Sequence, residues 1–390
     1  MAAQYGHLQF FRRMPNAYLA RYFKSKAISL GMDFNELKEN DADAILQSFL
    51  KLPEEQQAVV EADFQDINAL AFDGGVKALV DEAAYHDEDD SFAQAISEIE
   101  SFHAKVMWAF LGYKCYWRGA SMFIHADSVS PSYWKKRNQL PPAIPCVEDE
   151  DIDALEKAIS DFFHTKEGKG RNCKVEPYRR HNKEYFFAYP EDFAQSDVEW
   201  VSDTLKTRAR HPAFEIIFVY CEEEHSLDIY APKNTKAVPT LQKLFAQTIL
   251  KLDTLPSGEI DNRVYDLTPL NDSSFEFNKT IESGIVGVVV TRLRLSLKHG
   301  VKRRIVLEAD TKNNPQAVYE LLDELNLPEH HITQISLKVM FEPTVDNPRG
   351  KTRRFNITHP NSCALNHSGN DAVIRDMLAQ SGIEPALQPD

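Results

Sequence analysis

The sequence predicts an α+β protein, in which a helical N-terminal domain precedes two repeated ββαββα units, each a four-stranded antiparallel sheet with helices on one face. Apolar residues recur at helical spacing through roughly the first 120 residues, and they alternate with polar residues near residue 290. A similar order of elements also occurs twice after residue 172. A period of 3.6 residues is typical of helices, and a period of two is typical of half-buried strands.

The first domain is predicted to span residues 1–145. Asn40–Leu50, Glu54–Ala71 and Phe92–Phe110 contain no internal proline and place apolar residues three and four positions apart. Such spacing indicates amphipathic helices that bury one face. The stretch Pro141-Pro142-Ala143-Ile144-Pro145 has the composition of a linker and therefore predicts the first domain boundary.

The most clearly patterned unit is predicted over residues 285–390. Val288–Lys298 places Leu293 and Leu295 on one side and Arg292 and Arg294 on the other, which predicts a half-buried strand. The remaining elements expected in this unit are a strand at Lys302–Ala309, a helix that begins at Pro315, strands at Thr333–Phe341 and Arg353–Thr358, and a helix at Ala372–Gln380.

A first copy of the same unit is predicted over residues 146–251, and residues 252–284 are expected to link the two. Ser196 is a suitable cap for a helix in which Val198, Val201 and Leu205 fall at helical spacing. The other elements expected in this copy are strands at Cys173–Tyr178, Tyr185–Tyr189, Phe214–Tyr220 and Leu227–Tyr230, and a helix at Val238–Leu250. The matching order of elements predicts an internal repeat.

The overall composition narrows the function classes. No apolar run among the 390 residues approaches the roughly 18 residues of a membrane span, so no membrane partner is expected.

The five cysteines are widely spaced and lack a C-x-x-C pair, which favours reduced thiols and a cytoplasmic protein. An acid-poor segment over residues 1–32 is also typical of an organellar transit peptide, but its apolar spacing favours a folded helix. The net charge of −15 argues against indiscriminate binding of nucleic acids.

The best candidate for metal or nucleophile chemistry is the segment from His359 to His367. His359, Cys363 and His367 are spaced four residues apart and would align on a helix. However, Pro360 and the nearby asparagines disfavour a continuous helix, so a buried structural cysteine is the preferred interpretation. We therefore predict no metal and no cofactor, and no pattern in the sequence assigns catalytic residues.

The strongest functional pattern is a set of basic residues. Between residues 291 and 360 there are twelve Lys or Arg residues and eight Asp or Glu residues, within an otherwise acidic chain. Strand alternation and turn positions predict exposed contacts to phosphate or to a partner at Arg292, Arg294, Lys298, Lys302, Arg303, Arg304, Lys338, Arg354, Arg179 and Arg180. The competing interpretation is that these charges only prevent an exposed sheet from aggregating.

These patterns predict a non-catalytic, cytosolic binding or regulatory subunit of a larger assembly, whose basic sheet face contacts nucleic-acid phosphates. A protein partner or a second copy of the chain is expected, and nucleic acid is the further candidate. Two alternatives remain open. One is a nucleic-acid hydrolase with dispersed carboxylate and histidine residues, and the other is an adaptor that contacts only proteins.

Overall fold

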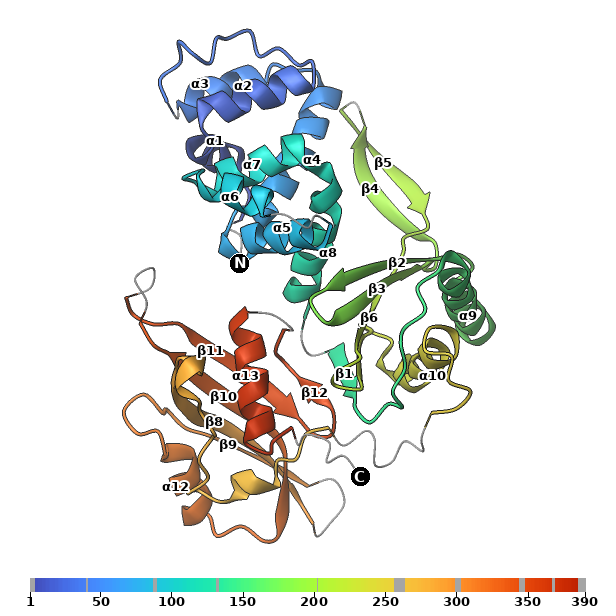
Figure 1. Cartoon of the computed structure of the whole chain (residues 1–390), viewed down its shortest axis with the longest axis vertical. Helices are drawn as coiled ribbons and strands as arrows, with labels where there is room; N and C mark the ends of the chain where they lie inside the picture. Colours follow the sequence, from blue (N-terminus) through green and yellow to red (C-terminus); the bar gives the residue numbers. More distant parts are fainter. Residues whose placement is uncertain are drawn as a thin grey trace. The chain divides into compact units, whose positions relative to one another are not determined.

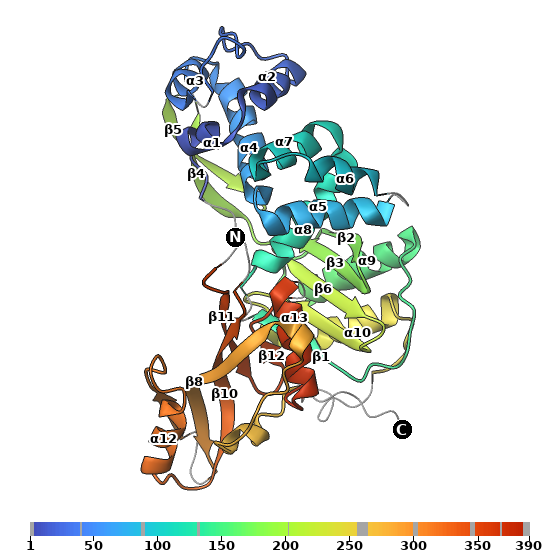
Figure 2. The same cartoon turned by 60° about the vertical axis from the view of Figure 1, so that its left-hand side comes forward.

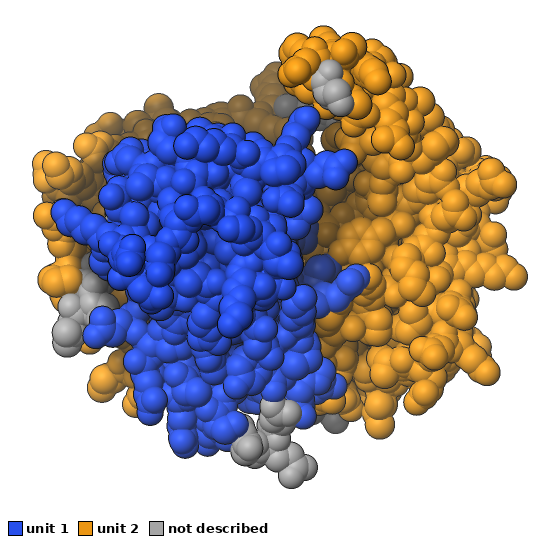
Figure 3. Space-filling model, turned by 90° about the horizontal axis from the view of Figure 1, so that it is seen from above, with its two compact units in different colours: residues 1–129 blue, residues 130–390 orange. Residues whose placement is uncertain are grey.

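The computed structural model describes residues 4–39, 41–86, 90–130, 133–201, 203–255, 264–298, 303–343, 348–366 and 369–384 (Figure 1). The chain divides into two compact units, residues 1–129 and 130–390 (Figure 3). The division precedes the proline-rich segment 141–145 because Trp134–Arg137 already forms strand β1, which pairs with β7 (Ser226–Tyr230) in the second unit. Within the described ranges, no helix is long and apolar enough to cross a bilayer.

The first unit is helical, as the sequence predicts. Its helices are α1 (His7–Arg13), α2 (Asn16–Ser25), α3 (Ala42–Phe49), α4 (Glu54–Leu70), α5 (Asp73–His86), α6 (Ser91–Ser97), α7 (Phe102–Gly112) and α8 (Lys114–Ser128). The single helix predicted over Phe92–Phe110 is wrong. The chain breaks before α7 because Ser101 caps it, and the Ser101 hydroxyl accepts a hydrogen bond from the Ala104 amide at 3.1 Å.

Aromatic packing stabilises the first unit. The rings of Phe10 and Phe64 stack with centroids 4.4 Å apart, and Tyr22 lies 4.7 Å from Phe64. The Tyr22 hydroxyl donates to Asp63 at 2.6 Å, and Lys26 pairs with the same carboxylate at 2.5 Å. The polar end of the buried tyrosine is therefore satisfied, as burial of a phenol requires.

His103 on α7 is a titratable group in this core. Its side chain is 8% exposed and lies 5.9 Å from the Phe10 ring, centroid to centroid. Burial, assisted by the positive charge of Arg13, lowers the pKa of His103 from 6.5 to about 4. The folded first unit therefore holds His103 neutral at pH values where the unfolded chain protonates it.

We expect the stability of the protein to fall as the pH decreases from 6.5 toward 4. In that window the unfolded chain binds a proton at His103 and the folded chain does not, so acid favours unfolding, by on the order of 2 kcal/mol. Urea unfolding at several pH values should show a shallower pH dependence for His103→Leu than for the wild type. His331→Leu, which removes an exposed histidine, is the control. An unchanged slope in His103→Leu would contradict the assignment.

The first sheet of the second unit is antiparallel, with strand order β1-β7-β6-β3-β2. Its other strands are β2 (Cys173–Arg180), β3 (Lys183–Pro190) and β6 (Ile216–Cys221), and its helices are α9 (Asp149–Glu167) and α10 (Val238–Thr248). Phe245 of α10 packs on the sheet, with its ring 5.2 Å from Phe218 and 5.1 Å from Phe186. Every residue of β6 is buried, as its continuous apolar sequence predicts.

The helix predicted from Ser196 is wrong. Instead, β4 (Gln195–Val201) and β5 (Thr204–Arg210) form a separate two-stranded hairpin (Figure 2). Val198, Val201 and Leu205 do fall at helical spacing, but Val198 and Leu205 also fit strand alternation. Charged side chains occupy every second position of both strands, on the face that also carries Val201. Asp203 at the turn has a φ of +59°, a conformation that aspartate tolerates and that suits a tight hairpin.

The second sheet is also antiparallel, with strand order β12-β11-β10-β8-β9. Its strands are β8 (Ile285–Leu297), β9 (Arg304–Glu308), β10 (His330–Phe341), β11 (Thr352–Thr358) and β12 (Ser362–Cys363), and its helices are α12 (Ala317–Glu324) and α13 (Gly369–Gln380). Val318 of α12 and Ile374 of α13 share one core with Leu293 and Ile335 of the sheet. Val264 and Tyr265 belong to the same core, so the predicted linker 252–284 is in part a component of this fold.

The predicted internal repeat is not confirmed. The α+β class holds, but both sheets have five strands instead of four. In the first sheet the strands β2, β3, β6 and β7 are neighbours in chain order, which makes a meander. In the second sheet the first strand, β8, lies between β9 and β10. Matching the order of elements does not detect this difference, because pairing partners are chosen by tertiary contacts.

Candidate functional site

The second sheet carries a cluster of cations on the face opposite its helices, here called the basic sheet face. Its members are Arg292, Arg294, Arg304, Lys338 and Arg354. The strand register aligns them. Arg354 pairs with Lys338, Arg292 pairs with Ser336, and Ser296 pairs with Arg304. Their alternate neighbours Leu293, Leu295 and Phe355 are buried in the core, as the sequence predicts.

Neutral hydrogen-bonding groups lie between these cations. Gln334 donates to Thr358 at 2.8 Å, and the Ser336 hydroxyl donates to Asn356 at 2.6 Å. The Arg294 guanidinium donates through Nε to the Thr333 hydroxyl at 3.2 Å. Arg, Ser, Thr, Asn and Gln are the side chains that most often donate to phosphate oxygens.

The positive charge of the basic sheet face is only weakly neutralised. Arg292 Nε lies 3.9 Å from a Glu308 carboxylate oxygen, and that carboxylate is mostly exposed. Among the described residues, Arg304, Lys338 and Arg354 have no carboxylate within 4 Å. Partial burial and the charges of Arg304 and Arg292 lower the pKa of Arg294. The guanidinium groups therefore repel one another, and an external anion would relieve that repulsion.

The remaining predicted basic contacts are placed differently. Lys298 is exposed and pairs with Glu329 at 3.2 Å, and Arg303 is exposed. Arg179 is exposed and lies 3.4 Å from Glu184. Arg180 is only 7% exposed, so it does not belong to the exposed basic surface. Lys302 lies outside the described residues.

The candidate nucleophile Cys363 is a core residue. It lies in β12, is 3% exposed and pairs with Ile357 of β11. Burial raises the pKa of the Cys363 thiol to about 12, so the reactive thiolate is disfavoured. His359 is not on a helix with Cys363, and its Nδ1 lies 3.0 Å from the carbonyl oxygen of Tyr265. His367 lies outside the described residues.

A second charged group, which the sequence analysis missed, lies between the two sheets of the second unit. Most of its members are buried, but the Glu224 side chain is 42% exposed. This junction cluster contains three cations and three carboxylates: Lys136, Lys183, Arg375, Glu224, Asp228 and Glu384. Lys136 Nζ lies 2.5 Å from Glu384 and 2.8 Å from Glu224, and Lys183 lies 3.3 Å from Glu224. The residues come from distant parts of the chain, so no local sequence motif predicts the cluster.

The ionisation states in the junction cluster depend on one another. Burial would lower the pKa of Lys136, but Glu384 and Glu224 outweigh it and raise that pKa. Burial would raise the pKa of Glu224, yet Lys136 and Lys183 hold it below its ordinary value. Burial does raise the pKa of Asp228, against the opposing charges of Lys136 and Arg375. The charge state of each residue in the cluster therefore depends on the charges of its neighbours.

The junction cluster lies where two sheet edges meet. The Lys136 amide in β1 donates to the Asn361 carbonyl at 3.0 Å, and the Ser362 hydroxyl in β12 donates to the Trp134 carbonyl at 3.1 Å. Arg375 of α13 is buried beside them and donates to the Leu365 carbonyl at 2.8 Å. These contacts make the junction cluster a structural connection between the sheets.

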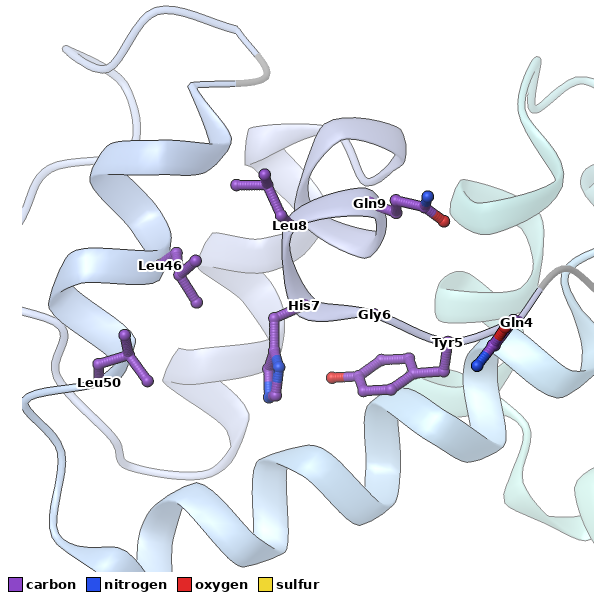
Figure 4. A pocket seen from close by; sticks show the side chains of 8 residues that line it. All are labelled: Gln4, Tyr5, Gly6, His7, Leu8, Gln9, Leu46 and Leu50. Carbon is purple, nitrogen blue, oxygen red and sulfur yellow. The ribbon is translucent and has the colours of Figure 1, made fainter.

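The first unit contains a hollow of about 520 Å³ lined by Gln4, Tyr5, Gly6, His7, Leu8, Gln9, Leu46 and Leu50 (Figure 4). His7 Nε2 lies 2.8 Å from a Glu61 carboxylate oxygen. Burial and the Glu61 charge raise the pKa of Tyr5, so its phenol stays protonated. The remaining lining side chains are aliphatic or amide groups, and the hollow offers little chemistry beyond this histidine–carboxylate pair.

No protein-family model and no curated protein matches the chain. Across the described ranges, no three His, Cys, Asp or Glu side chains are grouped so that they could hold a metal ion. The basic sheet face is then the surface whose chemistry points most directly to a ligand. Arg304 and Arg354 are exposed, Arg292, Arg294 and Lys338 are partly exposed, and most of these charges have no carboxylate nearby in the described part of the chain.

We expect Lys136→Met to destabilise the second unit by about 3 kcal/mol, because it leaves the buried carboxylate of Glu384 without its partner. Denaturant unfolding would measure this destabilisation. Adding Glu384→Gln should recover part of the stability, since the unpaired charge is removed. Lys298→Met breaks an exposed pair and should cost at most about 1 kcal/mol. Equal effects of the two lysine variants would contradict a buried role for Lys136.

Proposed function

We propose that the chain is a non-catalytic, cytosolic binding subunit that contacts the phosphates of a nucleic acid through the basic sheet face. The observation that supports this function most is the crowding of Arg292, Arg294 and Arg304, in which only Arg292 lies near a described carboxylate, that of Glu308. Like charges this close raise the free energy of the unbound protein. Binding of an anionic chain lowers this free energy. Crowded cations of this kind therefore favour ligand binding, a role distinct from keeping the protein soluble.

The chemistry of the face suits a sugar–phosphate backbone better than bases. Guanidinium groups bind phosphate through two parallel hydrogen bonds, and the neighbouring Ser336, Asn356 and Gln334 supply neutral donors. The face residues that the register aligns include no aromatic side chain on which a base would stack. Binding is therefore expected to depend on salt and only weakly on sequence.

The net charge of −15 is compatible with this function. At physiological ionic strength, charges farther apart than about 8 Å are largely screened, so a polyanion on the sheet responds mainly to the local cations. Successive cations on one face of a strand, such as Arg292 and Arg294, are about 6.7 Å apart. That separation equals about two nucleotide rises along one strand of B-form DNA.

The test is the double charge reversal Arg304→Glu and Arg354→Glu, two exposed arginines on strands β9 and β11. Fluorescence anisotropy with labelled duplex and single-stranded oligonucleotides should show an affinity at least about tenfold lower than that of the wild type. The slope of log K against log salt should decrease by about two units, because each reversed arginine leaves one phosphate without its cation.

The matched control is Lys157→Glu with Lys243→Glu, which changes the net charge equally on exposed positions of helices α9 and α10. This control should bind like the wild type. Equally weakened binding in both double variants would show a general charge effect, and no binding by the wild type in low salt would reject the proposed function.

A further inference from the structure

We propose that the β4–β5 hairpin is a self-association surface, on which the same hairpin of a second copy of the chain packs face to face. The surface consists of Val198 and Trp200 on β4 together with Leu205, Thr207 and Ala209 on β5. Trp200 is 69% exposed, Val198 61% and Leu205 56%. This inference is independent of the basic sheet face.

The strand register places these residues on one face of the hairpin. Trp200 lies opposite Leu205, and Val198 lies opposite Thr207. In an antiparallel pair, residues directly opposite each other project to the same side. The apolar side chains are therefore contiguous, unlike Ile144 and Ile281, which are exposed on other segments of the unit.

The other face of the hairpin is charged, and four of its five charged side chains are paired within the hairpin. Arg210 pairs with Asp197, and Arg208 Nη1 lies 3.8 Å from Glu199. The charged face can therefore remain in water without a binding partner. The hairpin is therefore amphipathic: one face carries paired charges, and the other carries exposed apolar side chains.

A hairpin of this kind is not stable alone. Two isolated strands are at best marginally stable in water, and β4 and β5 pair with no further strand among the described residues. A contiguous apolar face next to two unpaired edges is also an aggregation hazard unless it is covered. Packing a second apolar sheet against it buries these side chains and leaves both charged faces in water.

Charge favours a second copy as the occupant. The segment 195–210 carries three acidic and three basic residues, so it is neutral in a chain of net charge −15. Two copies that meet through their hairpins bring together neutral patches, so this contact adds no like-charge repulsion in a chain of net charge −15. An isologous contact of this kind also closes as a dimer.

The distribution of charge favours face-to-face packing of two hairpins over pairing of their edge strands. Asp197 and Glu199 lie on β4, and Lys206, Arg208 and Arg210 lie on β5. Symmetric pairing of β4 with β4, or of β5 with β5, would set like charges against each other, which is destabilising. Packing through the apolar faces avoids this repulsion.

The size of the hairpin indicates a weak, reversible dimer. From strand spacing and rise, one face of two seven-residue strands buries on the order of 1,000 Å² in total when two copies meet, the lower end for specific contacts. Trp200 lies within the patch and is the expected energetic centre, because tryptophan is enriched among residues that dominate interfaces.

Sedimentation velocity of the full chain over about 1–500 μM should show a monomer–dimer equilibrium with a micromolar dissociation constant. Trp200→Lys with Leu205→Lys should raise this constant at least tenfold. Ile144→Lys with Ile281→Lys makes the same number of apolar-to-lysine changes at exposed positions elsewhere and should leave it unchanged. Near-UV circular dichroism establishes that both variants are folded.

Hydrogen exchange supplies a second measurement on the unaltered protein. Amides of residues 203–210 should exchange more slowly at 300 μM than at 3 μM, because pairing covers the hairpin. A wild type that stays monomeric at 500 μM overturns the proposal. If the hairpin is protected equally at both concentrations in a monomer, the chain itself covers it, and the assignment of a second copy is wrong.

Discussion

The second unit depends on the pairing of the Lys136 ammonium with Glu384 and Glu224. An isolated ammonium in this position would be strongly unfavourable, so the lysine is stable only while both carboxylates are present. Lys136 lies in the edge strand of the first sheet, and Glu384 follows the last helix of the second. Glu224 comes from the first sheet and Glu384 from the region after α13, so full pairing of Lys136 makes the two sheets interdependent. Hydrogen bonds between β1 and the β12 region add to that connection.

Basic residues in this unit therefore have two opposite roles. Lys136 and Arg375 are buried with compensating partners and contribute to structure, while Arg304 and Arg354 are exposed without carboxylate partners among the described residues. The difference follows from burial, since a buried cation must be neutralised internally and an exposed one is screened by water and salt. Exposed, crowded cations are the ones that remain able to bind an external anion.

The success of the sequence predictions depended on how distinctive each local pattern was. Alternation over Val288–Lys298 correctly separated Leu293 and Leu295 from Arg292 and Arg294, because a strand with one buried face specifies its register strongly. In the segment 196–205, the helical spacing of Val198, Val201 and Leu205 was misleading, and the helix prediction failed there. Charged residues at alternate positions on both strands were the better indicator, together with β-branched and aromatic residues, which favour strands.

The sequence by itself determined the class of the fold, the helical first unit, most strand positions and the side of the second sheet on which its arginines lie. These features follow from neighbouring residues through periodicity, capping and burial. Only the tertiary structure decided the strand order, the burial of Arg180 and the meeting of Lys136 with Glu384, which lie 248 residues apart in the chain. Such contacts depend on which elements pack together, and local propensities carry no information about partners at that separation.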